Sequence, residues 1–246
     1  MSEPFSYCIP LRPRNTAANW SRVEQLLGAA IATALAGDDI RIVVAGTDEP
    51  DVAQLSDPRV TFVQTDAMAD QMADKQNKKQ VALYTAAAAV GPGLYMYLDA
   101  DDHVHRDLPR YVRGVDGAGV VITKGYEFHV GDRLYWELGD FHLYCGTCAV
   151  FRFEQNDLPK QLGDSGCYAS RFRNHAEWKV LAEEAGRPLV PSRMLGALYA
   201  IANGENHSSR MGHPSRKRQI YRLLVPGRRV DAELLQAFPG LVHLTE

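Results

Sequence analysis

The sequence lacks the features of membrane, secreted and nucleic-acid-binding proteins. Its longest apolar stretch, residues 81–90, is interrupted by Thr85 and is too short to span a bilayer. The first four residues form no basic or apolar signal region, so we expect no secretory signal. The 27 lysines and arginines are balanced by 30 acidic residues, which argues against non-specific binding to nucleic acid. We therefore expect a cytoplasmic protein with no transmembrane segment, while peripheral association with a membrane stays open.

Cysteine is also scarce, with four in 246 residues. Cys145 and Cys148 have the CxxC spacing of a redox pair or of half a zinc site. No second pair has zinc spacing, however, and the motif lies in a strand-like run instead of preceding a helix. We therefore expect packed thiols in a reducing compartment.

The chain alternates between apolar strands and amphipathic or alanine-rich helices. With 46% hydrophobic and 23% charged residues and no repeat or linker, it reads as one globular domain. The pattern predicts strands over residues 5–10, 40–45, 59–63, 94–98, 120–123 and 144–153, an apolar stretch over 195–202, and helices over 20–36, 74–90 and 174–185. Ser21 and Glu24 have the spacing of a capping box. This order predicts an α/β fold with a mostly parallel central sheet and helices on both faces.

An acidic cluster follows the strand predicted over residues 94–98. Asp99, Asp101 and Asp102 occupy three of four positions, so their carboxylates repel one another unless a cation or hydrogen-bond donors offset the charge. Mg²⁺ and Mn²⁺ prefer oxygen ligands and complete their shells with phosphate oxygens and water, which suits a nucleoside diphosphate. The alternative is an acidic loop that caps the helix near residues 107–113.

Three segments together resemble the inverting glycosyltransferases of the GT-A type: YMYLDADD at residues 95–102, IPLR at 9–12 and CGTCAVFR at 145–152. In that family a nucleotide-sugar lies across the first and fourth strands, and a DXD motif binds Mn²⁺ or Mg²⁺ on its diphosphate. The resemblance covers most of the chain. It implies a single GT-A domain over 1–246, in which residues 1–115 bind nucleotide, 116–205 face the acceptor and 206–246 form a basic lid or tail.

The resemblance also implies roles for individual residues. Asp99 would contact the ribose and Asp101 the metal, with Asp102 able to share or replace that second role. His207 fits the family's third metal ligand and favours Mn²⁺ over Mg²⁺. The implied nucleotide contacts are Pro10, Leu11, Arg12, Lys75, Lys79, Asp99, Ala100 and Arg210. Arg12 could equally be a surface residue.

Some of these residues have simpler interpretations. Lys75 and Lys79 lie near the start of a predicted helix, where backbone N–H groups favour anions, but both could be solvated lysines. His103 and His105 lie two apart on an extended segment; they could reach a metal, but we expect them to point into solvent.

The catalytic base is the weakest match to the family. Inverting transfer needs a base that takes the proton of the acceptor hydroxyl. The family places a carboxylate at the start of the helix near residue 174, where this chain has Asn174. His175, Glu177 or Asp164 could act instead. A nucleotide-binding protein without transfer activity therefore stays an alternative.

We expect a metal-dependent transfer of sugar from a UDP-sugar to the hydroxyl of an unknown glycan, lipid or protein acceptor, with inversion. A second alternative is a phosphatase of the haloacid-dehalogenase type with Asp99 as nucleophile. In that family the acidic motif normally closes the first strand, whereas three predicted strands precede it here.

Residues 206–230 carry seven basic side chains and no acid: Arg210, Arg216, Lys217, Arg218, Arg222, Arg228 and Arg229. We expect this segment to be mobile in the free protein and to order over a bound diphosphate, where Arg210, Arg216, Lys217 or Arg218 would neutralise charge. The alternative is a permanently solvated helix.

Overall fold

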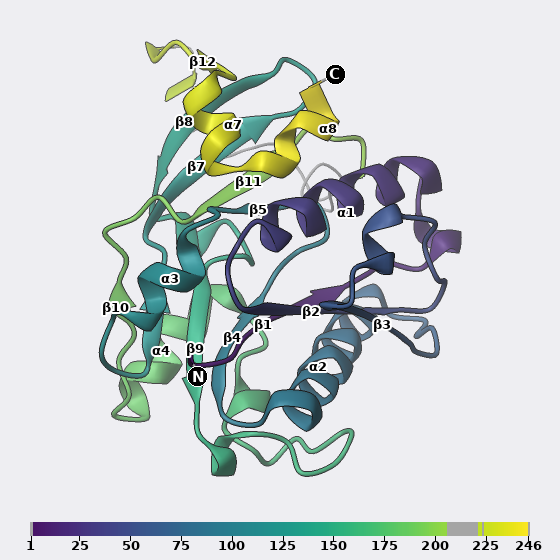
Figure 1. The fold of residues 1–246 in the computed structure, drawn as a ribbon, viewed down its shortest axis with the longest axis vertical. Coiled ribbons are helices and arrows are strands. Elements are labelled where there is room, and N and C mark those ends of the chain that lie inside the picture. Colours follow the sequence, from purple (N-terminus) through teal and green to yellow (C-terminus); the bar gives the residue numbers. More distant parts are fainter. Residues whose placement is uncertain (1, 206–220, 223, 246) are drawn as a thin grey trace.

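The computed structural model describes residues 2–205, 221–222 and 224–245 (Figure 1). Its larger sheet has the strand order β10-β6-β9-β4-β1-β2-β3. The strands are β1 (Phe5–Pro10), β2 (Ile40–Gly46), β3 (Val60–Gln64), β4 (Gly93–Tyr97), β6 (Gly119–Val121), β9 (Ala149–Phe153) and β10 (Val190–Pro191). The strands predicted in these regions are present, with ends that shift by a few residues and a β9 that begins five residues late.

Pairing in this sheet is mostly parallel. Strand β1 pairs in parallel with β2 on one side and with β4 on the other, and β2 pairs in parallel with β3. Strand β9 runs antiparallel to both β4 and β6. The carboxyl ends of β1 and β4 therefore lie side by side, with the Leu98 N–H donating to the Cys8 carbonyl at 3.1 Å. This edge is where ligands bind in open α/β sheets.

Helices cover both faces of the sheet, which confirms the predicted α/β fold. Helix α1 (Trp20–Leu35) lies on one side of β1, β2 and β3, and α2 (Gln71–Val90) lies on the other (Figure 1). The shorter helices α3 (Leu108–Arg113) and α4 (Trp178–Glu184) lie beyond β4. Every described helix is too short or too polar to cross a membrane.

The predicted capping box of α1 is wrong. Asn19 is the N-cap, and its side chain accepts from the Arg22 N–H, whereas the Glu24 carboxylate accepts from the Asp51 N–H in another loop. Asp70 caps α2, so this helix begins three residues earlier than predicted. Short polar side chains before a helix are good caps, and two of them compete at residues 19–21.

A second sheet, with the order β12-β8-β7-β11-β5, was not predicted as a unit. Its strands are β5 (His103–Val104), β7 (Lys124–His129), β8 (Leu134–Gly139), β11 (Ala197–Ile201) and β12 (Arg228–Arg229). The β7–β8 hairpin was missed, since charged and aromatic residues mask its alternation. Helices α7 (Ala232–Ala237) and α8 (Val242–Thr245) lie against this sheet at the top of Figure 1.

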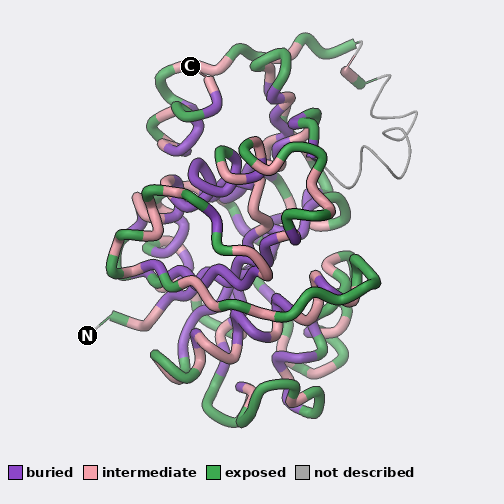
Figure 2. Tube along the Cα trace, turned by 90° about the vertical axis from the view of Figure 1, so that its right-hand side faces the viewer, coloured by how far each residue is buried: buried purple, intermediate pink, exposed green. Residues whose placement is uncertain are grey.

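The end of the chain takes part in the folded body. Leu234, Phe238, Leu241 and Leu244 are buried and form a core cluster with residues of β7, β8, β11 and α1. The buried segments run through the middle of the molecule in Figure 2, between exposed loops at its upper and lower ends. Residues 231–245, assigned to the tail from the sequence, are thus packed, while the region at 206–220 that carries most of the lid prediction lies outside the described residues.

The expectation that His103 points into solvent is wrong. Its side chain is fully buried, and its Nδ1 lies 3.2 Å from Oγ1 of Thr33. That hydroxyl donates to the Ala29 carbonyl and accepts from the Gly240 N–H, so Nδ1 acts as the donor to it. Burial lowers the pKa of His103 to about 3, and the ring stays neutral. His105 is half-buried and accepts from the Asp107 N–H.

We expect His103 to make the protein less stable in acid. The unfolded chain takes up a proton near pH 6.5 and the folded chain only near pH 3, so stability falls as the pH drops through this range. At pH 5 the loss from this residue is about 2 kcal/mol. Urea unfolding at pH 7 and pH 5 should show a smaller pH dependence for His103→Asn than for wild type. The exposed His243→Asn is the matched control; equal pH dependence in all three proteins would contradict the prediction.

Candidate functional site

A cleft of about 460 Å³ opens at the carboxyl ends of β1 and β4, a size ordinary for a small-molecule site. Six segments that are separated in the sequence line it, within residues 10–26, 68–79, 99–101, 144–146, 173–175 and 199–205. The residues predicted for the site that lie on its wall are Pro10, Leu11, Arg12, Lys75, Lys79, Asp99, Ala100, Asp101 and His175.

Two of the three carboxylates of the acidic turn face the cleft and the third faces the interior. Asp99 faces the cleft with Oδ1 at 2.8 Å from Nζ of Lys75. Asp101 also lines the cleft, and its Oδ2 accepts from Nδ2 of Asn203 at 2.8 Å. Asp102 instead turns into the protein, where only 1% of the residue is exposed. The sequence left open which carboxylate turns inward, and the structure answers that it is Asp102.

Asp102 is occupied by donors from two other parts of the chain. Its Oδ2 accepts from Oγ1 of Thr147 at 2.7 Å and from Sγ of Cys145 at 3.1 Å. Its Oδ1 accepts from the Ala200 N–H at 3.2 Å. The expectation that Asp102 could share or replace the metal role of Asp101 is therefore wrong in this arrangement, because its oxygens face the interior.

Burial and mutual repulsion set the charges of this turn. Burial raises the pKa of Asp101, and the neighbouring Asp99 raises it further. Burial alone would also raise the pKa of Asp99, but Lys75 and Lys79 outweigh it and hold that pKa below its usual value. A cation beside Asp99 and Asp101 would relieve the repulsion between them.

The oxygen ligands in the cleft fit a hard divalent cation in part. Asp99 and Asp101 present carboxylate oxygens, which Mn²⁺ and Mg²⁺ accept, and such ions often use only one or two carboxylates. Within residues 2–205, 221–222 and 224–245, no group of three His, Cys, Asp or Glu side chains is placed to hold a metal. The expected third ligand, His207, lies outside the described residues.

Two lysines of α2 face the cleft. Lys75 is partly exposed and pairs with Asp99, whereas Lys79 is buried, with Nζ at 5.2 Å from the ring centre of Tyr97 and 5.3 Å from that of Trp178. Burial lowers the pKa of Lys79 to about 8, and Lys75 contributes to the shift. The interpretation of both as solvated lysines does not hold for Lys79.

Thr147 of the CGTC motif forms hydrogen bonds with both ends of the acidic turn. Oγ1 of Thr147 accepts from the Asp99 N–H at 3.0 Å and donates to Asp102, so one hydroxyl joins both ends of the turn. A Cβ at Gly146 would lie 2.7 Å from Oδ2 of Asp99, so a larger residue at this position would displace the Asp99 carboxylate. The four cysteines are buried and free, as expected from the sequence.

The candidate bases differ in position. His175 lines the cleft, and its Nδ1 lies 2.9 Å from the His142 carbonyl, so the neutral ring carries its proton on Nδ1 and leaves Nε2 as the acceptor. Burial lowers the pKa of His175, which favours this neutral form. Glu177 is exposed and accepts from Nδ2 of Asn174, and Asp164 accepts from backbone N–H groups of its own loop. Neither of these two carboxylates is among the residues that line the cleft.

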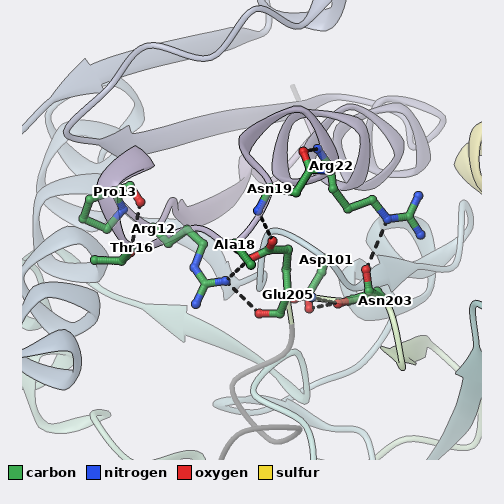
Figure 3. A network of polar contacts seen from close by, with 9 residues as sticks. All are labelled: Arg12, Pro13, Thr16, Ala18, Asn19, Arg22, Asp101, Asn203 and Glu205. Atoms are coloured by element: carbon green, nitrogen blue, oxygen red, sulfur yellow. Dashed lines mark hydrogen bonds and ion pairs between the residues drawn. The ribbon is translucent and has the colours of Figure 1, made fainter.

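Sequence reasoning missed Asn203 and Glu205, which follow β11 and are both buried. Nη1 of Arg12 donates to Oε2 of Glu205 at 2.6 Å (Figure 3), so this arginine is engaged with a carboxylate of the protein itself. The available signal was an Asn-Gly-Glu sequence directly after an apolar strand, because polar residues at a strand's carboxyl end reach the ligand edge.

The basic segment is described only in part. Arg210, Arg216, Lys217 and Arg218 lie outside the described residues, as does His207. Arg222 forms an ion pair with the buried Glu127, and Arg228 lies 3.2 Å from Asp231. Arg222 is therefore paired with an acid from a distant part of the sequence, and Arg228 with the residue that directly follows the basic segment.

No family model and no curated protein matches the chain. Solved structures that resemble it include S. aureus TarS, with 13% identity and a TM-score of 0.47 over 81% of this chain and 37% of that one. The mannosyltransferase PcManGT from Pyrobaculum calidifontis, in complex with GDP-Man and Mn²⁺, has 15% identity and a TM-score of 0.47 over 90% of this chain and 60% of that one. The chain thus spans less than two thirds of either structure. A 4-diphosphocytidyl-2C-methyl-D-erythritol synthase follows, with 14% identity and a TM-score of 0.37 over 91% and 99%.

Replacing Thr147 by valine should destabilise the acidic turn. The change keeps the shape of the side chain but removes the hydroxyl that bridges the Asp99 N–H and Asp102. We expect the free energy of unfolding to fall by about 2 kcal/mol, since buried polar groups lose their partner. Urea unfolding measures this, with the exposed strand residue Thr61→Val as control. Equal stability of the two variants would show that the bridge contributes little.

Proposed function

We propose that the protein is a metal-dependent glycosyltransferase of the GT-A type that transfers a sugar from a UDP-sugar to a hydroxyl acceptor with inversion. The observation that carries this proposal is the pair of cleft carboxylates, Asp99 and Asp101, held beside Lys75 and Lys79 at the ends of β1 and β4. Such a mixed charge pattern suits a diphosphate bound with a divalent cation, because the lysines and the cation together neutralise it.

The donor would lie across the two strand ends. Pro10 and Leu11 would contact the nucleoside at the end of β1, Asp99 the ribose, and Lys75 and Lys79 the diphosphate. Asp101 would hold the divalent ion, with His207 as the proposed further ligand. The metal supplies neutralising charge to the departing diphosphate.

His175 is the base that the geometry supports best. The acceptor oxygen forms a bond to the anomeric carbon while the bond from that carbon to the diphosphate breaks, and the diphosphate leaves with the electron pair. Nε2 of His175 takes the hydroxyl proton, since Nδ1 is anchored on the His142 carbonyl. Glu177 stays the second candidate, although it would have to turn from Asn174 into the cleft.

The phosphatase alternative is not favoured. Asp99 follows β4, the fourth strand along the chain, and its carboxylate is paired with Lys75. The second alternative is a protein that binds nucleotide without transferring sugar. A turnover assay with nucleotide-sugars distinguishes it from the main proposal. The proposed acceptor is a hydroxyl of a glycan, a lipid or a protein. The proposed location is the cytoplasm, with or without peripheral attachment to a membrane.

Asp101→Ala should remove the metal-dependent part of UDP binding. We expect Kd for UDP to rise about tenfold or more in Mn²⁺ and to stay unchanged in EDTA, because the variant loses a cation ligand on the cleft wall. Titration calorimetry measures both values, and the exposed Asp116→Ala is the control. Equal affinity of the wild-type protein for UDP in Mn²⁺ and in EDTA would contradict the metal role. The same titration with GDP tests whether the site prefers uracil to guanine.

His175→Gln should strongly reduce turnover while preserving binding. Loss of the base lowers kcat about a hundredfold or more, whereas Kd for UDP changes little. UDP release from a panel of UDP-sugars provides the assay, and Glu177→Gln is the matched comparison. Wild-type activity should persist from pH 7 to 6.5 and decline only in more acidic solution, because burial lowers the pKa of His175. A large loss in Glu177→Gln alone would transfer the role to that carboxylate.

A further inference from the structure

A buried carboxylate joins the chain after β11 to the loop between β1 and α1. The side chain of Glu205 is 4% exposed and accepts three hydrogen bonds from residues almost two hundred positions earlier. The donors are Nη1 of Arg12 at 2.6 Å, the Ala18 N–H at 3.1 Å and the Asn19 N–H at 2.6 Å (Figure 3). A buried carboxylate with this many donors holds its surroundings firmly.

Asn203 connects this carboxylate to the acidic turn. Its Oδ1 accepts from the Glu205 N–H at 2.8 Å, and its Nδ2 donates to Oδ2 of Asp101 at 2.8 Å. The Asn203 carbonyl also accepts from Nε of Arg22 in α1 at 3.2 Å. Both ends of the amide are therefore used, and this fixes which end faces Asp101.

The backbone after β11, around Asn203, adopts an unusual conformation that allows these contacts. Ala202 has φ 52° and Gly204 has φ 89°, so the residues on both sides of Asn203 adopt the left-handed region. An alanine rarely occupies this region, and the conformation carries a local energetic cost that the surrounding hydrogen bonds must offset.

We infer that Asn203 and Glu205 are positioning residues for Asp101. Asn203 holds one oxygen of the Asp101 carboxylate and thereby sets the orientation in which that carboxylate meets a divalent cation, while Glu205 holds Asn203 in place. Arg12 then acts through Glu205 instead of contacting the nucleotide, which changes the role expected from the sequence. This inference rests on the proposed function, since it concerns the same cation and diphosphate.

The network predicts a selective effect on metal-dependent binding. Partners that orient a metal ligand typically contribute a factor of about 10 to 100 to metal affinity. In Asn203→Leu, UDP affinity in Mn²⁺ should fall about tenfold or more, while UDP affinity in EDTA stays at the wild-type value. A residue that only stabilised the fold would lower both affinities together or neither.

Titration calorimetry with UDP in Mn²⁺ and in EDTA tests this, with the exposed Asn156→Leu as matched control. Asn203→Ser, whose side chain is too short to reach Asp101, repeats the test if the leucine variant does not fold. Glu205→Gln should show the same selective loss with a smaller factor, and Glu49→Gln, exposed and outside the cleft, is its control.

Arg12→Gln completes a double-mutant cycle with Glu205→Gln. If Arg12 acts only through Glu205, the double variant should bind UDP in Mn²⁺ as weakly as the weaker single variant. Additive losses would show that Arg12 contacts the nucleotide directly and would overturn this part of the inference.

Different results would overturn the proposed function and the role of Asn203 and Glu205. Wild-type protein that binds neither UDP nor GDP would overturn the proposed function and the inference together. Wild-type protein with Mn²⁺-dependent binding, combined with unchanged or equally reduced affinities in the Asn203 variants, would overturn the inference alone.

Discussion

Three carboxylates within four residues, at the end of a buried strand, must each find a compensating partner. The structure separates them: Lys75 pairs with Asp99, Asn203 donates to Asp101, and Thr147 donates to Asp102. These partners come from α2, from the turn after β11 and from the loop before β9. The need to satisfy one short acidic turn thus draws together segments from three distant parts of the chain.

This solution leaves the two cleft carboxylates in different electrostatic states. Asp99 is held ionised by the lysines, whereas the pKa of Asp101 is raised because burial and Asp99 both disfavour its charge. The turn therefore favours a positive ligand at Asp101 more than at Asp99. The second sheet also contributes to this site, since β11 leads directly into Asn203 and Glu205. Arg22 of α1 donates to the Asn203 carbonyl, and the N–H of Asn19, the N-cap of α1, donates to Glu205.

Several sequence predictions succeeded because they depend on local periodicity. The strands over β1, β2, β3 and β4 and the helices α1 and α2 follow from apolar spacing and from punctuation by glycine and proline. The β7–β8 hairpin and the burial of His103 could not be found this way. His103 is polar and lies beside an acidic turn, and its burial depends on a contact with Thr33, whose hydroxyl is itself held by the Gly240 N–H.

In the candidate site, too, some features could be predicted from the sequence and others could not. The strand pattern was enough to predict that the acidic turn lies at the ligand-binding edge, because parallel strands bring their carboxyl ends together. The resemblance to GT-A glycosyltransferases added Lys75, Lys79 and His175, which also line the cleft. By contrast, three contacts emerge only from the folded chain: Asp102 faces the interior, Glu205 holds Arg12, and Asn203 reaches Asp101. Each of those outcomes depends on donors more than forty residues away, whose positions are set by packing and leave no trace in local sequence pattern.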